Sequence, residues 1–151
     1  MPSLASKLRK DLENAVKRAR RVAEAGAVKA LEQLAVGHHE PWGSMKDPAL
    51  RRLRNRLRAH GQQLGDARDA QRGTQSISRL KGEVAYEHWH RMLFARYLAE
   101  NDLLIEPESG QAMTMDECRE LAREQGKDWL PLACGIALQM QPEIFRQGNP
   151  M

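Results

Sequence analysis

The residues of this chain with the most evident chemical potential are two pairs of histidines and one run of arginines. His88 and His90 lie two residues apart, and His38 and His39 are adjacent. Imidazole nitrogens bind zinc and act as general acids and bases. The arginines lie in RRLRNRLR, residues 51–58, and a guanidinium group binds phosphate through two parallel hydrogen bonds. The chemistry to consider is therefore metal binding, acid–base catalysis or nucleic-acid binding.

The spacing of the histidines argues against a metal site. Residues 83–102 have the apolar periodicity of a helix, on which His88 and His90 would point about 200° apart. Two ligands on one helix reach the same ion only at i, i+3 or i+4. His38 and His39 have no further ligand at a recognisable spacing. We expect structural roles for these histidines, with no metal ligand and no catalytic residue in this chain, which also argues against a free-standing enzyme.

The arginine run is the strongest functional signal in the sequence. The predicted DNA-binding residues are Arg51, Arg52, Arg54, Arg56 and Arg58. Several guanidinium groups on one face give an affinity for nucleic acid that falls as salt rises. Few aromatic residues are interspersed, so base stacking is not indicated. The alternative is a solvated basic helix face that pairs with acidic neighbours.

The two halves of the chain carry opposite charge. Residues 1–81 hold 18 Lys/Arg and 8 Asp/Glu, a net of +10, whereas residues 82–151 hold 6 and 12, a net of −6. A basic half favours a polyanionic partner. The alternative interpretation of this asymmetry is internal: the basic and the acidic half partly neutralise each other.

The spacing of apolar residues predicts an all-α fold. Steps of three and four from Leu4 to Ala35 predict one long helix, with Gly37 as its natural end. Asp47 as N-cap and Pro48 at the first helical position begin a second helix.

A central helix, about residues 76–101, is apolar over more than half its circumference and is expected to be buried. The polar segment 65–76 before it is either a fraying helix end or a mobile loop. Short helices follow, one from the capping box T-M-D-E at 114–117, one after Asp128, and a last turn or short helix opening at Pro142. The predicted fold is a multi-helix bundle with two long N-terminal helices, a buried central helix and short C-terminal helices.

The organisation expected is a basic long-helix region, residues 1–75, and a compact helical region, residues 76–151, within one structural domain. No stretch of about 18 apolar residues predicts a membrane span, and the N-terminus lacks the apolar core of a signal peptide. Cys118 and Cys134 lack metal-ligand spacing and indicate reduced thiols. A cytoplasmic location is therefore expected.

A resemblance to a known family covers roughly residues 77–150. Its segments are EVAYEHWHRMLFARYLAENDLLIEPESG, MDECRELAREQGKDWLPLA and MQPEIFRQGNP. They resemble the N-terminal helical region of large adenine-specific DNA methyltransferases of restriction–modification and phage-defence systems, which are type IIG-like enzymes with relatives in BREX and DISARM systems. In that family the region precedes a Rossmann-like domain that binds S-adenosylmethionine, where a (D/N/S)-P-P-(Y/F/W) motif holds the flipped adenine.

The resemblance implies that this chain is an N-terminal fragment of such an enzyme. Asn149-Pro150 lacks the second proline and the aromatic residue of the motif, so no catalytic or cofactor-binding residue carries over. Methyl transfer and S-adenosylmethionine would belong to the parent enzyme. This region would contact the DNA backbone through the arginine run, dock the catalytic domain or a partner subunit, or do both. The alternative is a helical protein–protein interaction or oligomerisation module without enzymatic activity, because the long first helix has near-heptad spacing.

Overall fold

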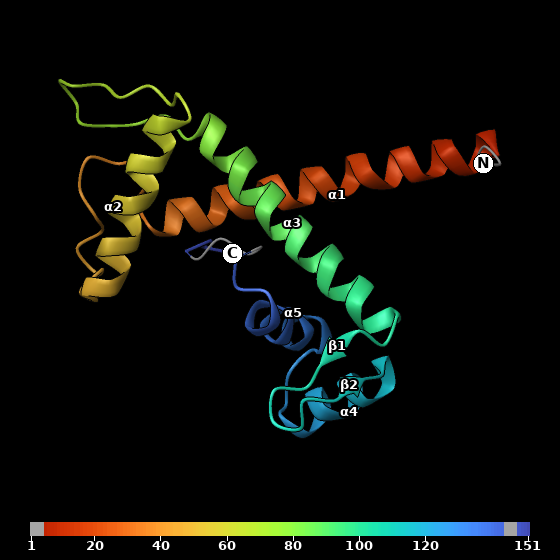
Figure 1. Ribbon diagram of the computed structural model, residues 1–151. Helices are drawn as coiled ribbons and strands as arrows, with labels where there is room; N and C mark the ends of the chain where they lie inside the picture. Colours follow the sequence, from red (N-terminus) through yellow and green to blue (C-terminus); the bar gives the residue numbers. More distant parts are fainter. Residues whose placement is uncertain (1–4, 144–147) are drawn as a thin grey trace. The chain divides into compact units, whose positions relative to one another are not determined.

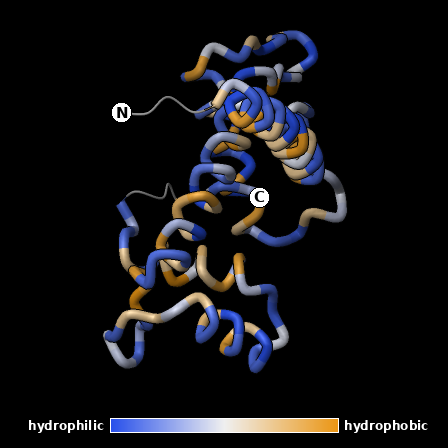
Figure 2. Tube along the Cα trace, turned by 90° about the vertical axis from the view of Figure 1, so that its right-hand side faces the viewer, coloured by the Kyte–Doolittle hydropathy of each residue, from blue (hydrophilic) through white to orange (hydrophobic). Residues whose placement is uncertain are grey.

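The computed structural model describes residues 5–143 and 148–151, and this part of the chain is mostly helical, as the sequence predicts (Figure 1). Its elements are, in order, α1 (Ser6–Gln33), α2 (Pro48–Gln63), α3 (Ser78–Glu100), β1 (Leu104–Ile105), β2 (Ala112–Met113), α4 (Met115–Glu124) and α5 (Trp129–Met140). Figure 2 shows hydrophobic positions interspersed with hydrophilic ones along the helices, the pattern of amphipathic helices.

The chain separates into two compact units, and each has its own core. The first unit is Met1–Tyr86 with Pro150–Met151, and the second is Glu87–Asn149. The boundary therefore lies inside α3, whereas the division drawn from the sequence lies between residues 75 and 76. A single helix thus supplies its first part to one core and its second part to the other.

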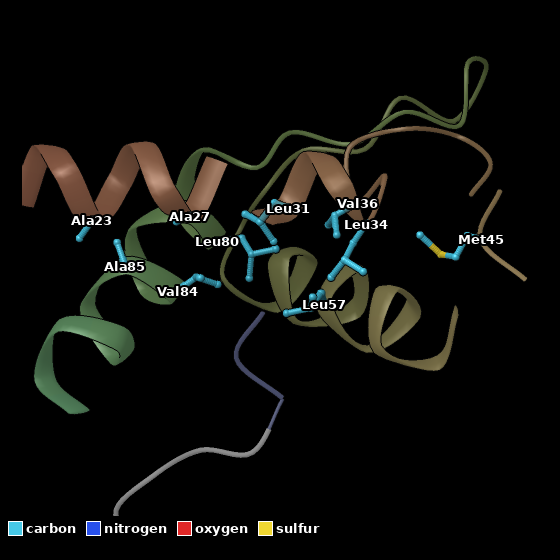
Figure 3. Close-up of a cluster of buried hydrophobic side chains, with 10 residues drawn as sticks. All are labelled: Ala23, Ala27, Leu31, Leu34, Val36, Met45, Leu57, Leu80, Val84 and Ala85. Atoms are coloured by element: carbon cyan, nitrogen blue, oxygen red, sulfur yellow. The ribbon is translucent and has the colours of Figure 1, made fainter. Parts of the chain in front are cut away.

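The core of the first unit is small and aliphatic. Figure 3 shows side chains from the end of α1, from α2 and from the start of α3 pointing toward one another. The buried cluster is Ala23, Ala27, Leu31, Leu34, Val36, Met45, Leu57, Leu80, Val84 and Ala85. The part of α1 before Ala23 buries no side chain in this core, and Figure 1 shows that end of the helix projecting away from α2.

The core of the second unit joins the end of α3 to a short hairpin, α4 and α5. Leu104 of β1 and Met113 of β2 are paired across the antiparallel hairpin, and both are buried. The rest of the cluster is Ala95, Leu98, Cys118, Ala133, Ile136 and Ala137. The sequence predicted no strand here, because strands of two residues are too short to show an alternating pattern.

The helix starts follow the local signals in the sequence. The Asp47 side chain accepts a hydrogen bond from the Ala49 N–H at 2.8 Å, directly before α2. The capping box of α4 is complete, with Glu117 accepting from the Thr114 N–H at 2.7 Å and donating its own N–H to the Thr114 hydroxyl. Both predicted caps are confirmed.

At the C-terminal end, the agreement with the sequence is partial. Asp128 precedes α5, as predicted, but its side chain accepts no capping hydrogen bond. The predicted turn or short helix opening at Pro142 falls largely on residues 144–147, which lie outside the described part of the chain.

The end of α1 differs from the prediction. The helix ends four residues before Gly37, and Ala35 adopts the left-handed conformation with φ 51°. The Val36 N–H donates to the Leu31 carbonyl at 3.0 Å, and the Ala35 N–H donates to the Glu32 carbonyl at 2.9 Å. This is the Schellman hydrogen-bond pattern. Val36 and Leu31 are both fully buried, so tertiary packing holds a non-glycine residue in a conformation that costs it roughly 1–2 kcal/mol.

The central helix is less buried than its composition indicates. Tyr86, Leu93 and Tyr97 on α3 are each more than half exposed, which corrects the prediction of a helix buried on several sides. The reason is that each part of α3 packs in a different core, and each core covers only one face of the helix.

The segment after α2 is a folded loop rather than a fraying helix end. It closes on itself through an isolated bridge between Arg68 and Gln75 and a hydrogen bond from the Ser76 N–H to the Ala67 carbonyl at 2.8 Å. The buried carboxylate of Asp66 then caps the start of α3.

This cap consists of two hydrogen bonds. One Asp66 oxygen accepts from the Arg79 N–H at 2.8 Å, and the other accepts from the Leu80 N–H at 3.0 Å. We expect Asp66→Ala to lower the free energy of unfolding by roughly 1–3 kcal/mol, because two N–H groups at the start of α3 lose their acceptor in a buried place.

The matched control is Asp69→Ala. The Asp69 side chain also accepts two backbone N–H groups, from Gln71 and Arg72, but at an exposed position. Water can replace it there, so we expect a loss below about 1 kcal/mol. Urea unfolding followed by circular dichroism measures both variants, and equal losses would contradict the role given to burial.

Candidate nucleic-acid interface

The position of each arginine of the run follows from the face of α2 on which it lies. The buried face of α2 consists of Arg54, Leu57, Arg58 and Gly61, which follow the i, i+3, i+4, i+7 spacing of one helical face. Arg54 is 5% exposed and Arg58 is 9% exposed. Two of the five predicted DNA-binding residues therefore point into the first unit.

Arg54 binds backbone carbonyls just beyond the end of α1. Its Nε donates to the Ala35 carbonyl at 3.0 Å. Its Nη2 donates to the backbone carbonyl of His38 at 2.7 Å and to that of His39 at 3.1 Å. One guanidinium group thus holds three carbonyls of the segment that leaves α1.

Arg58, one turn further along α2, binds the same segment and a second one. Its Nη1 donates to the Val36 carbonyl at 2.8 Å and also to the His38 carbonyl. Its Nη2 donates to the Gly73 carbonyl at 2.8 Å. Arg58 therefore ties the end of α1 and the loop after α2 to the same helix.

These two cations have no ion-pair partner among the described residues. Burial is the main cause that lowers the pKa of Arg54 and of Arg58, and neighbouring arginine charge lowers each further. An arginine remains charged in proteins, so the carbonyls must compensate the charge. Their position after α1 helps, since the C-terminal end of a helix carries partial negative charge.

Exposed cations remain on the first unit after Arg54 and Arg58 are set aside. Arg51, Arg52 and Arg56 are exposed on α2, and Arg51 also donates through Nε to the Met45 carbonyl at 2.8 Å. The other exposed cations are Lys7, Arg9, Lys10, Lys17, Arg18, Arg20, Arg21, Lys29, Lys46, Arg68, Arg72 and Arg79. None of these was among the residues predicted from the sequence, although the cluster KRARR at residues 17–21 was a readable signal.

The histidines do not converge on a metal site. The Nε2 of His38 lies 2.8 Å from a Glu32 carboxylate oxygen, and its ring lies 4.5 Å from that of Trp42. Within residues 5–143 and 148–151 no group of three or more His, Cys, Asp or Glu side chains is placed to hold a metal ion. His88 is partly buried on α3. Burial, with a smaller effect from the charge of Arg91, lowers its pKa.

The second unit contains a groove of about 520 Å³ between α4 and α5. Leu121, Pro131, Leu132 and Ile136 contribute apolar side chains to its lining, together with polar residues that include Asp128. None of the predicted site residues lines it.

Three comparisons with known proteins give no relative for this chain. No protein-family model matches it, and searches of curated proteins and of solved structures find no match. None of the described helices has the length and apolar character needed to cross a membrane.

The structural role of Arg58 can be tested against its exposed neighbour. We expect Arg58→Met to lower the free energy of unfolding by about 3 kcal/mol, because buried carbonyls are then left without a charged donor. Arg56→Met, on the exposed side of α2, is the matched control and should change it by less than about 0.5 kcal/mol. Chemical denaturation of the two variants decides this, and similar small losses would show that Arg58 is not structural.

His88 should contribute to the pH dependence of stability. Because its pKa is lower in the folded protein than the unfolded value of about 6.5, the unfolded chain takes up the proton first as pH falls. Its contribution is fully present above pH ~6.5 and declines below it. We expect the free energy of unfolding to fall less between pH 7.5 and 5.5 in His88→Gln than in the wild type. Urea titrations at both pH values measure this, and identical differences would refute it.

Proposed function

We propose that this chain is a helical DNA-binding module that holds the phosphate backbone through exposed cations of α1 and α2. The observation that carries the proposal is the exposed charge of the first unit. Its described residues expose 15 Lys/Arg side chains and 6 Asp/Glu side chains. The excess persists without the two buried arginines, so a polyanion is the partner that this surface favours.

The chemistry of the surface supports contacts to phosphate rather than to bases. Lysine and arginine contacts to phosphate position a protein on a duplex without reading its sequence. Stacking on bases requires exposed aromatic side chains. Among the described residues of this unit, the exposed large aromatic side chains are Trp42 and Tyr86. We therefore propose binding that is sensitive to salt and tolerant of sequence.

The cations best placed for this role are exposed ones that no described residue engages in an ion pair. Among the described residues, Lys17 and Arg20 are paired along α1 with Glu13 and Glu24. Arg21, Arg52 and Arg56 are exposed and form no such ion pair in the described chain. These three are the residues that we propose to contact DNA, in place of the full run of five.

We further propose that the module serves an adenine-specific DNA methyltransferase of restriction–modification or phage-defence type. The support is the resemblance over residues 77–150, and the catalytic domain or a partner subunit would be the second partner. Among the described residues, the strand that leads into a helix is β2, and Thr114 follows it without the glycine-rich turn of a dinucleotide-binding fold. S-adenosylmethionine would therefore be bound by another domain. A cytoplasmic location goes with this proposal and fits the free cysteines Cys118 and Cys134.

The test is fluorescence anisotropy of a labelled duplex at several salt concentrations. The variant carries Arg21→Gln, Arg52→Gln and Arg56→Gln. We expect weaker binding and a slope of log Kd against log salt that is smaller by about one for each of these arginines that binds a phosphate.

The matched control removes three exposed arginines from the acidic second unit. It carries Arg96→Gln, Arg119→Gln and Arg123→Gln, which are exposed on α3 and α4. Both variants lose the same net charge, so a general charge effect would weaken them equally. An unchanged salt slope in the first variant, or equal changes in the two, would reject the proposed interface.

A further inference from the structure

The projecting part of α1 carries an apolar stripe that the described residues of its own unit leave largely exposed. The stripe consists of Ala5, Leu8, Leu12, Ala15, Ala19 and Val22. Leu8 and Leu12 are each 54% exposed and Val22 is 74% exposed. Their spacing alternates between three and four residues, which is the heptad pattern of helices that pair. We propose that α1 pairs antiparallel with α1 of a second copy of this chain, a role beyond the proposed DNA binding.

The stripe is distinct from the face with which α1 packs in its own core. At 100° per residue its centre lies about a quarter turn from the face of Ala23, Ala27 and Leu31. That core therefore cannot cover it. Most of the stability of a helix in a protein comes from packing of its amphipathic face, so the exposed apolar stripe calls for a partner helix.

The sizes of the side chains favour the antiparallel direction. In an antiparallel pair the layers match Ala5 with Val22, Leu8 with Ala19, and Leu12 with Ala15, and the twofold axis repeats each layer. Every layer then joins an alanine to a larger residue, and such alternation fills the space between two helices evenly. A parallel pair in register would stack leucine on leucine and alanine on alanine.

The charges beside the stripe favour the same direction. Asp11 and Arg18 flank the stripe on one side, and neither has an ion pair within the described residues. In the antiparallel register Asp11 of each copy faces Arg18 of the other, which gives two symmetric ion pairs. The basic clusters at residues 17–21 then lie at opposite ends of the pair, whereas a parallel pair would place them side by side.

The contact is of modest length. Residues 5–22 give an overlap of about 27 Å, which places the interface at the small end of specific interfaces. We therefore expect a dimer that dissociates in the micromolar range rather than an obligate one.

The experiment is sedimentation velocity of the full chain without DNA over a range of protein concentrations. The wild type should show a concentration-dependent monomer–dimer equilibrium. Asp11→Arg and Arg18→Asp should each weaken the dimer at least about fivefold, since like charges then face each other at two places. The double variant, Asp11→Arg with Arg18→Asp, should restore it, because it re-forms the pairs with reversed sign.

Two further variants keep the test decisive. Leu12→Glu places a charge in the stripe at an exposed position and should abolish the dimer while circular dichroism shows a folded chain. Lys10→Glu, on the helix surface away from the stripe, should leave the dimer unchanged. A chain that stays monomeric at all concentrations, or a double variant that does not recover, would overturn the proposal. The variant with Arg21, Arg52 and Arg56 changed should dimerise normally, so failure of the DNA-binding proposal is a separate result.

Discussion

The first unit depends on the requirement that two buried cations be surrounded by acceptors. A buried charge is costly unless it is paired or fully hydrogen-bonded, and Arg54 and Arg58 meet this requirement mainly with backbone carbonyls, together with a longer contact from Arg54 to the Asn55 amide oxygen. Carbonyls cannot move independently of the chain. The two guanidinium groups therefore fix the segment after α1 and the loop after α2 against the same face of one helix.

This polar network is important for the stability of the first unit because the apolar core beside it is small. Three of the ten residues in the buried cluster of the first unit are alanine, and alanine contributes little apolar area. The loops interlock as well. Gly73 has φ 68°, and a Cβ at that position would overlap the imidazole ring of His39. Close contacts between loops thus help to fix the fold of the first unit, a role that a larger apolar core plays in other proteins.

The helix α1 combines two properties that the proposals assign to different sides of it. Arg21 is exposed and lies outside the apolar stripe, whereas Asp11 and Arg18 border that stripe. Phosphate binding needs cations at a solvated surface, and helix pairing needs a dry apolar seam. Since the two sets of side chains do not overlap, a paired helix would still present its outer cations to DNA.

The sequence by itself determined the features that arise from local interactions. The all-α class, the start of α2 at Asp47 and Pro48, and the capping box at Thr114 could all be read, because these signals act within one helical turn. Only the tertiary structure decided which arginines of the run face inward. Arg54 and Arg58 are arginines like the other members of the run, and nothing in the local sequence sets them apart. They are buried because carbonyls from a segment some twenty residues earlier lie against their face of α2. The end of α1, closed by the left-handed Ala35, was decided in the same way, since it rests on packing that no local pattern encodes.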